Sequence, residues 1–242
     1  LTVTILQFTT LAMKGGAYVY YFENYVSKNS LSDFISPIID FLSSVGINFF
    51  GSDPVSAGFG LFNAGGIIFM IIGIGLSKIL ADKYGKRNVF GVFLFISTLF
   101  ILVFYILSPD SINLIFGAQI FHGFFYGITI PLLWAMIADV ADYSEWKNSR
   151  RATAIIFSAM MVGLKLGLSI GGALVASILG SYGYVPNSVG EQTESAILGT
   201  KMLVSIFPSI PFLVAAALLF FYVIDKKMEE KIERDLLKKR KS

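Results

Sequence analysis

The 242-residue sequence is 55% hydrophobic and 14% charged, with a formal net charge of +3 and a mean hydropathy of +0.72. Soluble domains carry about 25% charged residues, so this composition excludes an ordinary soluble domain and predicts an integral membrane protein. Cysteine is absent and histidine occurs once, which excludes a disulfide framework, thiol chemistry and a histidine-based zinc site.

Six apolar stretches are long enough to cross a bilayer, for which about 20 residues suffice. They are expected at 2–26, 56–80, 89–107, 112–137, 153–182 and 199–224, followed by a charged tail at 225–242. The expected fold is therefore all-α, a polytopic membrane protein with six transmembrane helices. The sequence begins at Leu1, which is not a methionine, and it is already apolar there. We therefore expect the chain to be cut from a longer protein.

Residues 27–55 are also apolar, but Asp33, Pro37 and Asp40 argue against a seventh span. We expect an outer loop here, with a short interfacial helix. The charged loops at 81–88 and 138–152, together with the tail, hold 15 of the 19 Lys and Arg residues when Lys78 is counted with them. Positive residues stay inside, so six spans place both ends of the chain in the cytoplasm, at the cell membrane.

The first span carries a polar stripe, in which helical spacing places an amide, an ammonium and three phenols on one face. Its members are Gln7, Lys14, Tyr18, Tyr21 and Tyr25. Tyrosines in a membrane helix often form an interfacial belt. Lys14 lies too deep for a belt, and this favours the lining of a cavity.

The fourth span has a comparable face, formed by Gln119, His122, Tyr126 and Thr129, with Trp134 nearer its inner end. His122 could act as a proton relay, or it could donate a hydrogen bond to a neighbouring helix. The residues leave these two interpretations open.

The fifth span has Lys165 at its middle, where a lysine costs about 2.5–3.5 kcal/mol on insertion scales. Helical spacing places Ser158 and Ser169 on the same stripe as Lys165, and Gly163, Gly167 and Gly171 on another stripe, roughly opposite. The glycine stripe predicts close packing against a neighbouring helix. Lys165 is either neutralised by a structural carboxylate or part of a solute or ion pathway.

Asp139, Asp142 and Glu145 recur every three residues at the inner end of the fourth span. Acids at a helix C-terminus are opposed by the helix dipole and need cations. The same membrane face carries such cations, namely Lys83, Lys86, Arg87, Arg150 and Arg151. This segment is either a solvated charged loop or an ionic latch that forms in one conformation and breaks in another.

Buried polar groups occur in the first, second, fourth and fifth spans, while the third and sixth carry few. Two triplets of helices, each with two lining members and one outer member, are what an inverted repeat of a transporter would produce. The rival interpretations are a six-helix scaffold subunit without transport, and an intramembrane enzyme. The enzyme lacks support because no Ser–His or paired-Asp constellation lies at membrane depth, so we expect no enzyme.

Several segments resemble known transporters. ADKYGKR resembles the loop motif of the major facilitator superfamily, D-(R/K)-x-G-(R/K)-(R/K), with Lys78 where a glycine is usual. PLLWAMIADVADYSEWKNSRRAT, FSAMMVGLKLGLSIGGAL and GYVPN are similar to the C-terminal half of the glycoside–pentoside–hexuronide:cation symporters, the melibiose-permease group. MKGGAYVYYFENYV is similar to the opening helix of that half, so the resemblance covers essentially the whole chain.

The resemblance implies a twelve-helix protein made of two six-helix halves, with a sugar site between them. It places Lys165 in the sugar and cation site and gives Asp139, Asp142 and Glu145 a role in gating. The implied partners are a sugar, a coupling Na⁺ or H⁺, membrane lipid and an N-terminal six-helix half; no nucleic acid, resident metal or cofactor is expected.

Candidate residues for sugar contact, which supply aromatic faces, amides and a charge, are Lys165, Trp134, Tyr18, Tyr21, Gln119 and Tyr126. Candidates for gating or coupling are Asp139, Asp142, Glu145, Arg87, Arg150, Arg151, Lys14 and His122.

Overall fold

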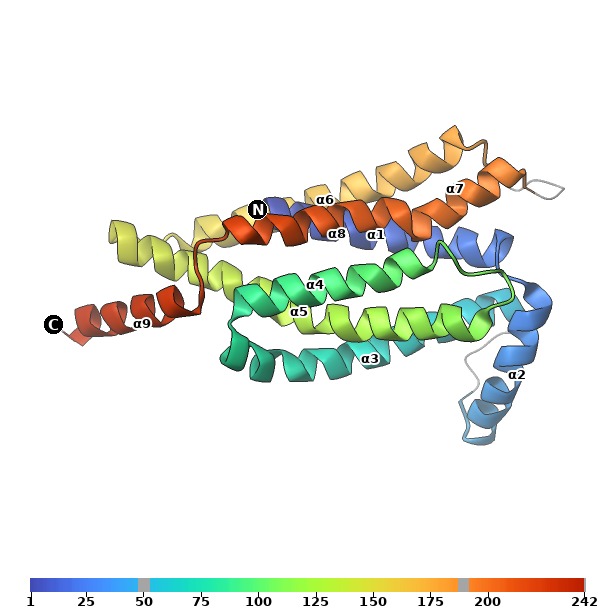
Figure 1. Ribbon diagram of the computed structural model, residues 1–242, viewed down its shortest axis with the longest axis horizontal. Helices are drawn as coiled ribbons and strands as arrows, with labels where there is room; N and C mark the ends of the chain where they lie inside the picture. Colours follow the sequence, from blue (N-terminus) through green and yellow to red (C-terminus); the bar gives the residue numbers. More distant parts are fainter. Residues whose placement is uncertain (48–52, 187–191, 242) are drawn as a thin grey trace.

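The computed structural model describes residues 1–47, 53–186 and 192–241, and within these ranges all regular structure is helical. The helices are α1 (Thr2–Asn24), α2 (Lys28–Ser44), α3 (Pro54–Tyr84), α4 (Lys86–Val103), α5 (Ile112–Asn148), α6 (Thr153–Ser181), α7 (Glu194–Val204), α8 (Ile206–Leu218), the 3₁₀ helix Leu219–Phe221 and α9 (Lys226–Lys241). The long helices run side by side along one axis, α2 lies across one end, and α9 extends from the other end (Figure 1). We call these the α2 end and the α9 end.

Five helical segments in the described ranges are long and apolar enough to cross a membrane: 54–84, 86–103, 112–148, 153–181 and 194–221. The all-α polytopic fold is thereby confirmed. The first expected span, at 2–26, corresponds to α1, which falls outside these five and buries polar side chains such as Gln7, Thr10 and Lys14. It nevertheless packs lengthwise against α6 and α8 in the bundle. The polar side chains of α1 therefore face the protein interior.

Two segments that we expected to be charged loops are mostly helical. Helix α5 continues to Asn148, so only 149–152 separates it from α6, and Gly85 alone separates α3 from α4. The α5 extension persists because Val140, Tyr143 and Trp146 pack against Ile232 and Leu236 of α9. We expected the span to end near residue 137, because the hydropathy of the sequence falls there. The helix continues because α9, a second amphipathic helix, covers the apolar side chains of this polar segment.

The last expected span is divided at Ser205, whose φ of −127° and ψ of −82° depart from helical values. Pro208 explains the break, because a proline lacks an N–H group and its ring clashes with the carbonyl four residues earlier. Side chains bond the carbonyls near the break: Thr10 Oγ1 donates to Pro208 O at 2.8 Å, and Ser209 Oγ donates to Ser205 O at 2.6 Å. The break is thus held against α1.

The glycine stripe of α6 packs against α1, as the sequence predicted. A Cβ atom added at Gly167 would lie 2.5 Å from Ile5 O, and one at Gly171 would lie 2.5 Å from Thr9 O. Real side chains never approach a backbone oxygen so closely, so only glycine allows this contact. Helices α3 and α5 meet in the same way, since Cβ atoms at Gly73, Gly123 and Gly127 would overlap backbone of the opposite helix.

The packing predicts that one of two glycine variants of α6 is destabilised and the other is not. Gly167→Ala forces α1 away and should lower the free energy of unfolding by about 1–3 kcal/mol, as overpacking does. Gly172→Ala is the matched control, because no atom of the described residues around it lies within 4 Å of its Cβ position. Thermal unfolding in detergent should show a lower Tm for Gly167→Ala alone. Equal Tm values for both variants would contradict the packing account.

Candidate functional site

Polar side chains of α1 and α5 meet in the centre of the bundle and form what we call the ladder: Gln7, Lys14 and Tyr18 of α1 with Gln119, His122 and Tyr126 of α5. Gln7 Nε2 donates to the Tyr126 hydroxyl at 3.0 Å, and the Tyr18 hydroxyl donates to Gln119 Oε1 at 3.0 Å. All six are at most 8% exposed. Because α1 and α5 run in opposite directions, the bonded pairs lie at successive depths. Two expected polar faces are thus brought together.

Lys14 lies between the two bonded pairs and is 6% exposed. Its ammonium stands 5.3 Å from the centre of the Tyr18 ring, a cation–π distance. Among the described residues, no carboxylate forms an ion pair with Lys14. A buried and unpaired lysine is costly in a membrane protein, which makes it a candidate functional group.

His122 sits on α5 between Gln119 and Tyr126 along the ladder. Its Nδ1 lies 3.0 Å from the Ser97 carbonyl of α4, and its ring stacks on Tyr126 with centroids 5.8 Å apart. A carbonyl oxygen can only accept a hydrogen bond, so Nδ1 carries the hydrogen. Nε2 is the other nitrogen of the ring and takes no part in this bond. The hydrogen bond to a neighbouring helix is therefore present, and it fixes the ring orientation that a proton relay would also need.

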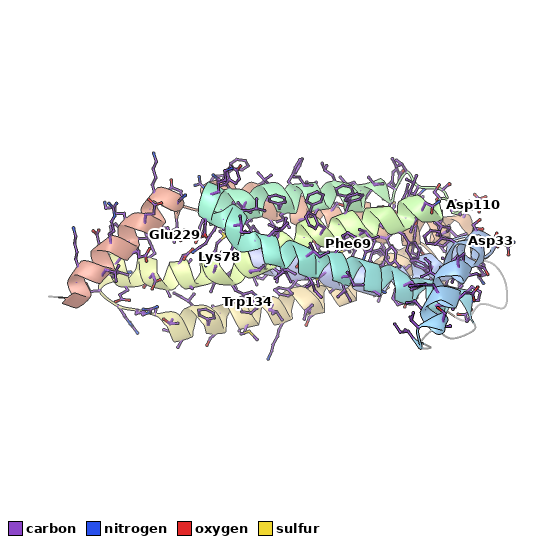
Figure 2. The ribbon with its side chains drawn as sticks, turned by 90° about the horizontal axis from the view of Figure 1, so that it is seen from below. Asp33, Phe69, Lys78, Asp110, Trp134 and Glu229 are labelled. Carbon is purple, nitrogen blue, oxygen red and sulfur yellow. The ribbon has the colours of Figure 1, made fainter. Side chains whose placement is uncertain are left out.

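The other candidate sugar contacts lie apart from the ladder. Tyr21 is fully buried in the aromatic cluster at the α2 end, where its ring stacks on Tyr25 with centroids 5.1 Å apart and its hydroxyl has no hydrogen-bond partner among the described residues. Trp134 is 38% exposed on α5, and Lys165 is exposed on α6, on the side away from the glycine stripe. Figure 2 shows Trp134 on the outside of the bundle. Within this chain, Lys165 and Trp134 therefore face outward.

The α9 end holds a network of ion pairs. Lys86, at the start of α4, binds Asp139 of α5 at 2.7 Å and Glu229 of α9 at 2.9 Å. Arg151 binds Asp142 at 3.0 Å and Glu145 at 3.4 Å, and thus links the start of α6 to α5. The three acids predicted to need cations are paired with two of the cations predicted for them.

The two remaining arginines act through backbone groups. Arg87 Nη1 donates to the backbone oxygen of Tyr222 at 3.0 Å, in the segment that leads into α9. The hydroxyl of Tyr222 in turn donates to Met136 O at 3.1 Å. Arg150 is exposed, and its carbonyl accepts a hydrogen bond from Ser144 Oγ at 3.0 Å. Arg87 therefore joins α4 to the segment before α9, while the Arg150 backbone closes the end of α5.

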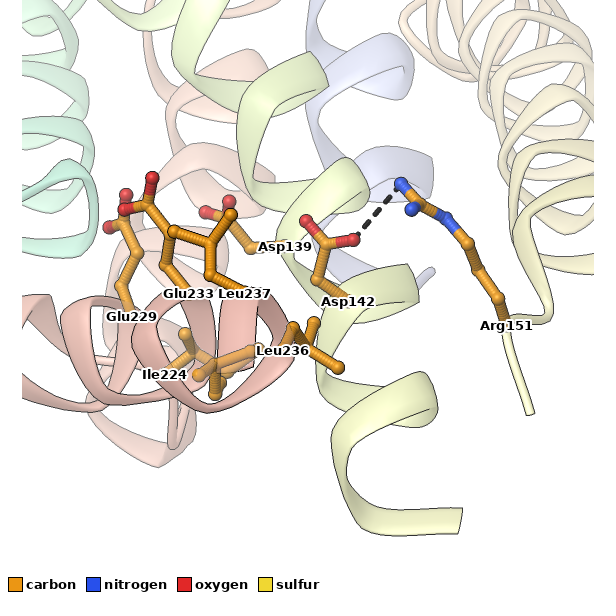
Figure 3. Close-up of a pocket in the computed structure, with 9 residues that line it drawn as sticks. Asp139, Asp142, Arg151, Ile224, Glu229, Glu233, Leu236 and Leu237 are labelled. Carbon is orange, nitrogen blue, oxygen red and sulfur yellow. Dashed lines mark ion pairs between the residues drawn. The ribbon is translucent and has the colours of Figure 1, made fainter. Parts of the chain in front are cut away.

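A cavity of about 370 Å³ opens at this network, between α5, α9 and the start of α6. It is lined by acids and by one arginine, with an apolar floor, and its lining comprises Asp139, Asp142, Arg151, Ile224, Glu229, Ile232, Glu233, Leu236 and Leu237. Figure 3 shows Asp142 and Arg151 pointing toward each other across it. Within the described ranges, no three His, Asp or Glu side chains are placed to hold a metal ion.

Sequence reasoning missed the contribution of α9. Glu229 pairs with Lys86, Lys226 Nζ donates to Asp82 O at 2.6 Å, and Trp146 Nε1 donates to Asp235 Oδ2 at 2.9 Å. The signal was the apolar spacing of Met228, Ile232 and Leu236 inside a charged tail, which gives the helix one apolar stripe. The tail therefore ties α3, α4 and α5 together at this end.

Comparison with known proteins gives consistent matches. Residues 41–226 match the family model described as MFS/sugar transport protein. The chain is 30% identical over 164 residues, 68% of its length, to the putative glycoside/cation symporter YagG of Escherichia coli, of which the match covers 35%. It is 38% identical over 113 residues, 47% of its length, to the isoprimeverose transporter of Lactiplantibacillus pentosus, of which the match covers 23%.

A third relative is an uncharacterized 29.9 kDa protein of Pseudescherichia vulneris, 35% identical over 158 residues, which are 65% of this chain and 57% of that protein. The chain therefore spans from about a quarter to just over half of the length of these relatives.

The ladder predicts a strong coupling between Gln7 and Tyr126. Tyr126→Phe alone should lower the free energy of unfolding by about 1–3 kcal/mol, because Gln7 Nε2 then loses its acceptor, and Gln7 Oε1 already has no hydrogen-bond partner in the described part of the chain. Adding Gln7→Leu should restore much of the loss, since both polar groups are gone. A double-mutant cycle followed by thermal unfolding measures this. Purely additive effects would contradict the bond.

Proposed function

The chain belongs to the MFS/sugar transport protein family, and on that premise we propose that it is the C-terminal half of a cation-coupled symporter for glycosides or related sugars. The observation that carries this proposal is the ladder. It concentrates hydroxyl, amide, imidazole and ammonium groups at the centre of a membrane bundle, where burying such groups is costly, so their presence there points to a function. A scaffold subunit has no such need.

The sugar would bind between this half and an N-terminal half of similar size. Lys165 and Trp134 face outward from this chain, and their exposure supports their placement at the surface that the other half would cover. A tryptophan face can stack on a sugar ring, and an ammonium can donate to its hydroxyls. Tyr18, Gln119 and Tyr126 would supply hydrogen bonds from the ladder side once the bundle opens. Tyr21, packed among aromatic rings, would support Tyr25 and Tyr18.

Coupling to Na⁺ or H⁺ would act through Lys14 and His122, which are buried, and through Lys165. Lys14 has no carboxylate partner within the described part of the chain, so a group from elsewhere in the protein, or the substrate, could approach it. Lys165 would organise the carboxylates of the cavity and exchange partners as cation and sugar bind. His122, oriented by Ser97, would move or hold a proton at Nε2.

The α9 end would face the cytoplasm of the cell, because most of the Lys and Arg residues gather there. The ion pairs of Asp139, Asp142 and Glu145 with Lys86 and Arg151 would form the latch of one conformation. Opening toward the cytoplasm would separate α6 from α5 and break the Arg151 pairs first, since these are the more exposed of the network.

Uptake of radiolabelled methyl glycosides by the full-length protein, driven by an imposed Na⁺ or H⁺ gradient, tests the proposal. Lys165→Leu should lower gradient-driven uptake by at least about tenfold, a loss of about 1.4 kcal/mol or more. Lys201→Leu is the control, because this lysine stacks on Tyr25 and Tyr105 at the α2 end. Near-parental coupled uptake by Lys165→Leu would remove Lys165 from the site. Failure of the parent to take up any glycoside under either gradient would contradict symport.

A further inference from the structure

Helix α2 is divided lengthwise into an apolar and a polar face. At 100° per residue, the apolar face takes Leu31, Phe34, Ile35, Ile38, Phe41 and Leu42, and Val45, the residue directly after the helix, continues it. The opposite face takes Asp33, Ser36, Asp40 and Ser44. Most of α2 precedes residue 41, where the match to the family model begins, so the family match leaves the role of this helix open.

The first half of α2 is fixed on the bundle. Leu31 is fully buried against Gly58 of α3, and Phe34 packs on Phe116 of α5 with ring centroids 4.9 Å apart. The preceding corner is tied to the α4–α5 connection, where Ser27 N donates to Pro109 O at 3.1 Å and Ser30 Oγ donates to Asp110 at 2.7 Å. Hydrogen bonds from the side-chain hydroxyls of Ser30 and Ser27 hold the pKa of the Asp110 carboxyl below its usual range.

The second half of the same face is more exposed, with Ile38 and Leu42 half-buried. Phe41 is 66% exposed and Val45 is 56% exposed, although they continue the stripe that buries Leu31 and Ile35. Helix α2 crosses the long axis of the bundle and projects past α3 (Figure 1). Because the stripe faces the ends of α3 and α5 where it is buried, its continuation faces the space beside those helices.

The chemistry of this region fits lipid. Helix α3, on which α2 packs, also exposes apolar side chains further along its length, including Ile67, Ile68 and Ile71. Lys28 is the one cation of α2, which also carries Asp33 and Asp40, so attraction to anionic headgroups contributes little. An amphipathic helix of this kind lies with its apolar face about 5–10 Å into the boundary between headgroups and acyl chains.

We propose that the second half of α2 is a lateral membrane anchor, with Phe41 and Val45 inserted among the lipids at the α2 end. The anchor holds the α1–α2 corner and the α4–α5 connection at a fixed depth, because both are bonded to the start of α2. This assignment does not depend on which solute, if any, the protein carries.

Spin labels test the anchor directly. The 242 residues contain no cysteine, so Phe41→Cys, Val45→Cys and the polar-face control Ser44→Cys each give one labelling site in this chain. The variants are labelled, reconstituted in phosphatidylcholine liposomes and measured by EPR with oxygen and with the water-soluble nickel complex NiEDDA. Labels at 41 and 45 should collide more often with oxygen than with the nickel complex, and the label at 44 should show the reverse.

Two outcomes would overturn the anchor. Frequent collisions with the nickel complex at 41 and 45, as at 44, would place the apolar face in water. Low collision rates with both reagents at 41 and 45 would show that protein, such as another part of the protein or a second copy, covers the face instead of lipid. All three positions are exposed, so size-exclusion profiles should match the parent and confirm that folding is intact.

Discussion

The close approach of helix backbones at glycines is the constraint on which the rest of this bundle depends. Helices α1 and α6 touch through Gly163, Gly167 and Gly171, and α3 and α5 touch through a second glycine set. In lipid there is no hydrophobic drive to bring helices together, so association relies on such backbone contact and on polar bonds. The molecule is thus built around two tightly packed pairs, α1 with α6 and α3 with α5.

The ladder lies at the boundary between these pairs, where side chains instead of backbones join α1 to α5. Gln7 with Tyr126 and Tyr18 with Gln119 hold the pairs in register, while Lys14 between them has aromatic contact but no described counter-charge. Polar bonds of this kind can be exchanged for bonds to a solute, whereas glycine contacts cannot. At the α9 end, Arg151 links the start of α6 to Asp142 of α5, which gives the boundary between the two pairs a second set of separable contacts, while Lys86 of α4 binds acids of α5 and α9.

Periodicity in the sequence predicted the faces of the helices but not their partners. The α6 glycine stripe follows from spacing alone and packs inside the bundle as expected. The polar faces of α1 and α5, which we expected to line a cavity, are buried against each other, and Lys165 faces outward. The pairing of Tyr18 with Gln119 could not be predicted, because register between helices distant in sequence is set by tertiary packing. The helical extension of α5 was missed because Tyr143 and Trp146 are covered by α9. By hydropathy alone, the α9 segment is only a charged tail.

Lys14 offers the most direct test of whether the ladder serves transport or only stability. A buried lysine without a counter-charge should lower the stability of the fold. If Lys14 is kept for function, the protein should therefore become more stable when an apolar residue of similar length replaces it. The measurement is glycoside uptake per folded molecule of the full-length Lys14→Met protein, with its Tm in detergent. The account predicts an equal or higher Tm together with uptake reduced by about tenfold or more. Parental uptake with a lower Tm would show that Lys14 is structural and would contradict the account.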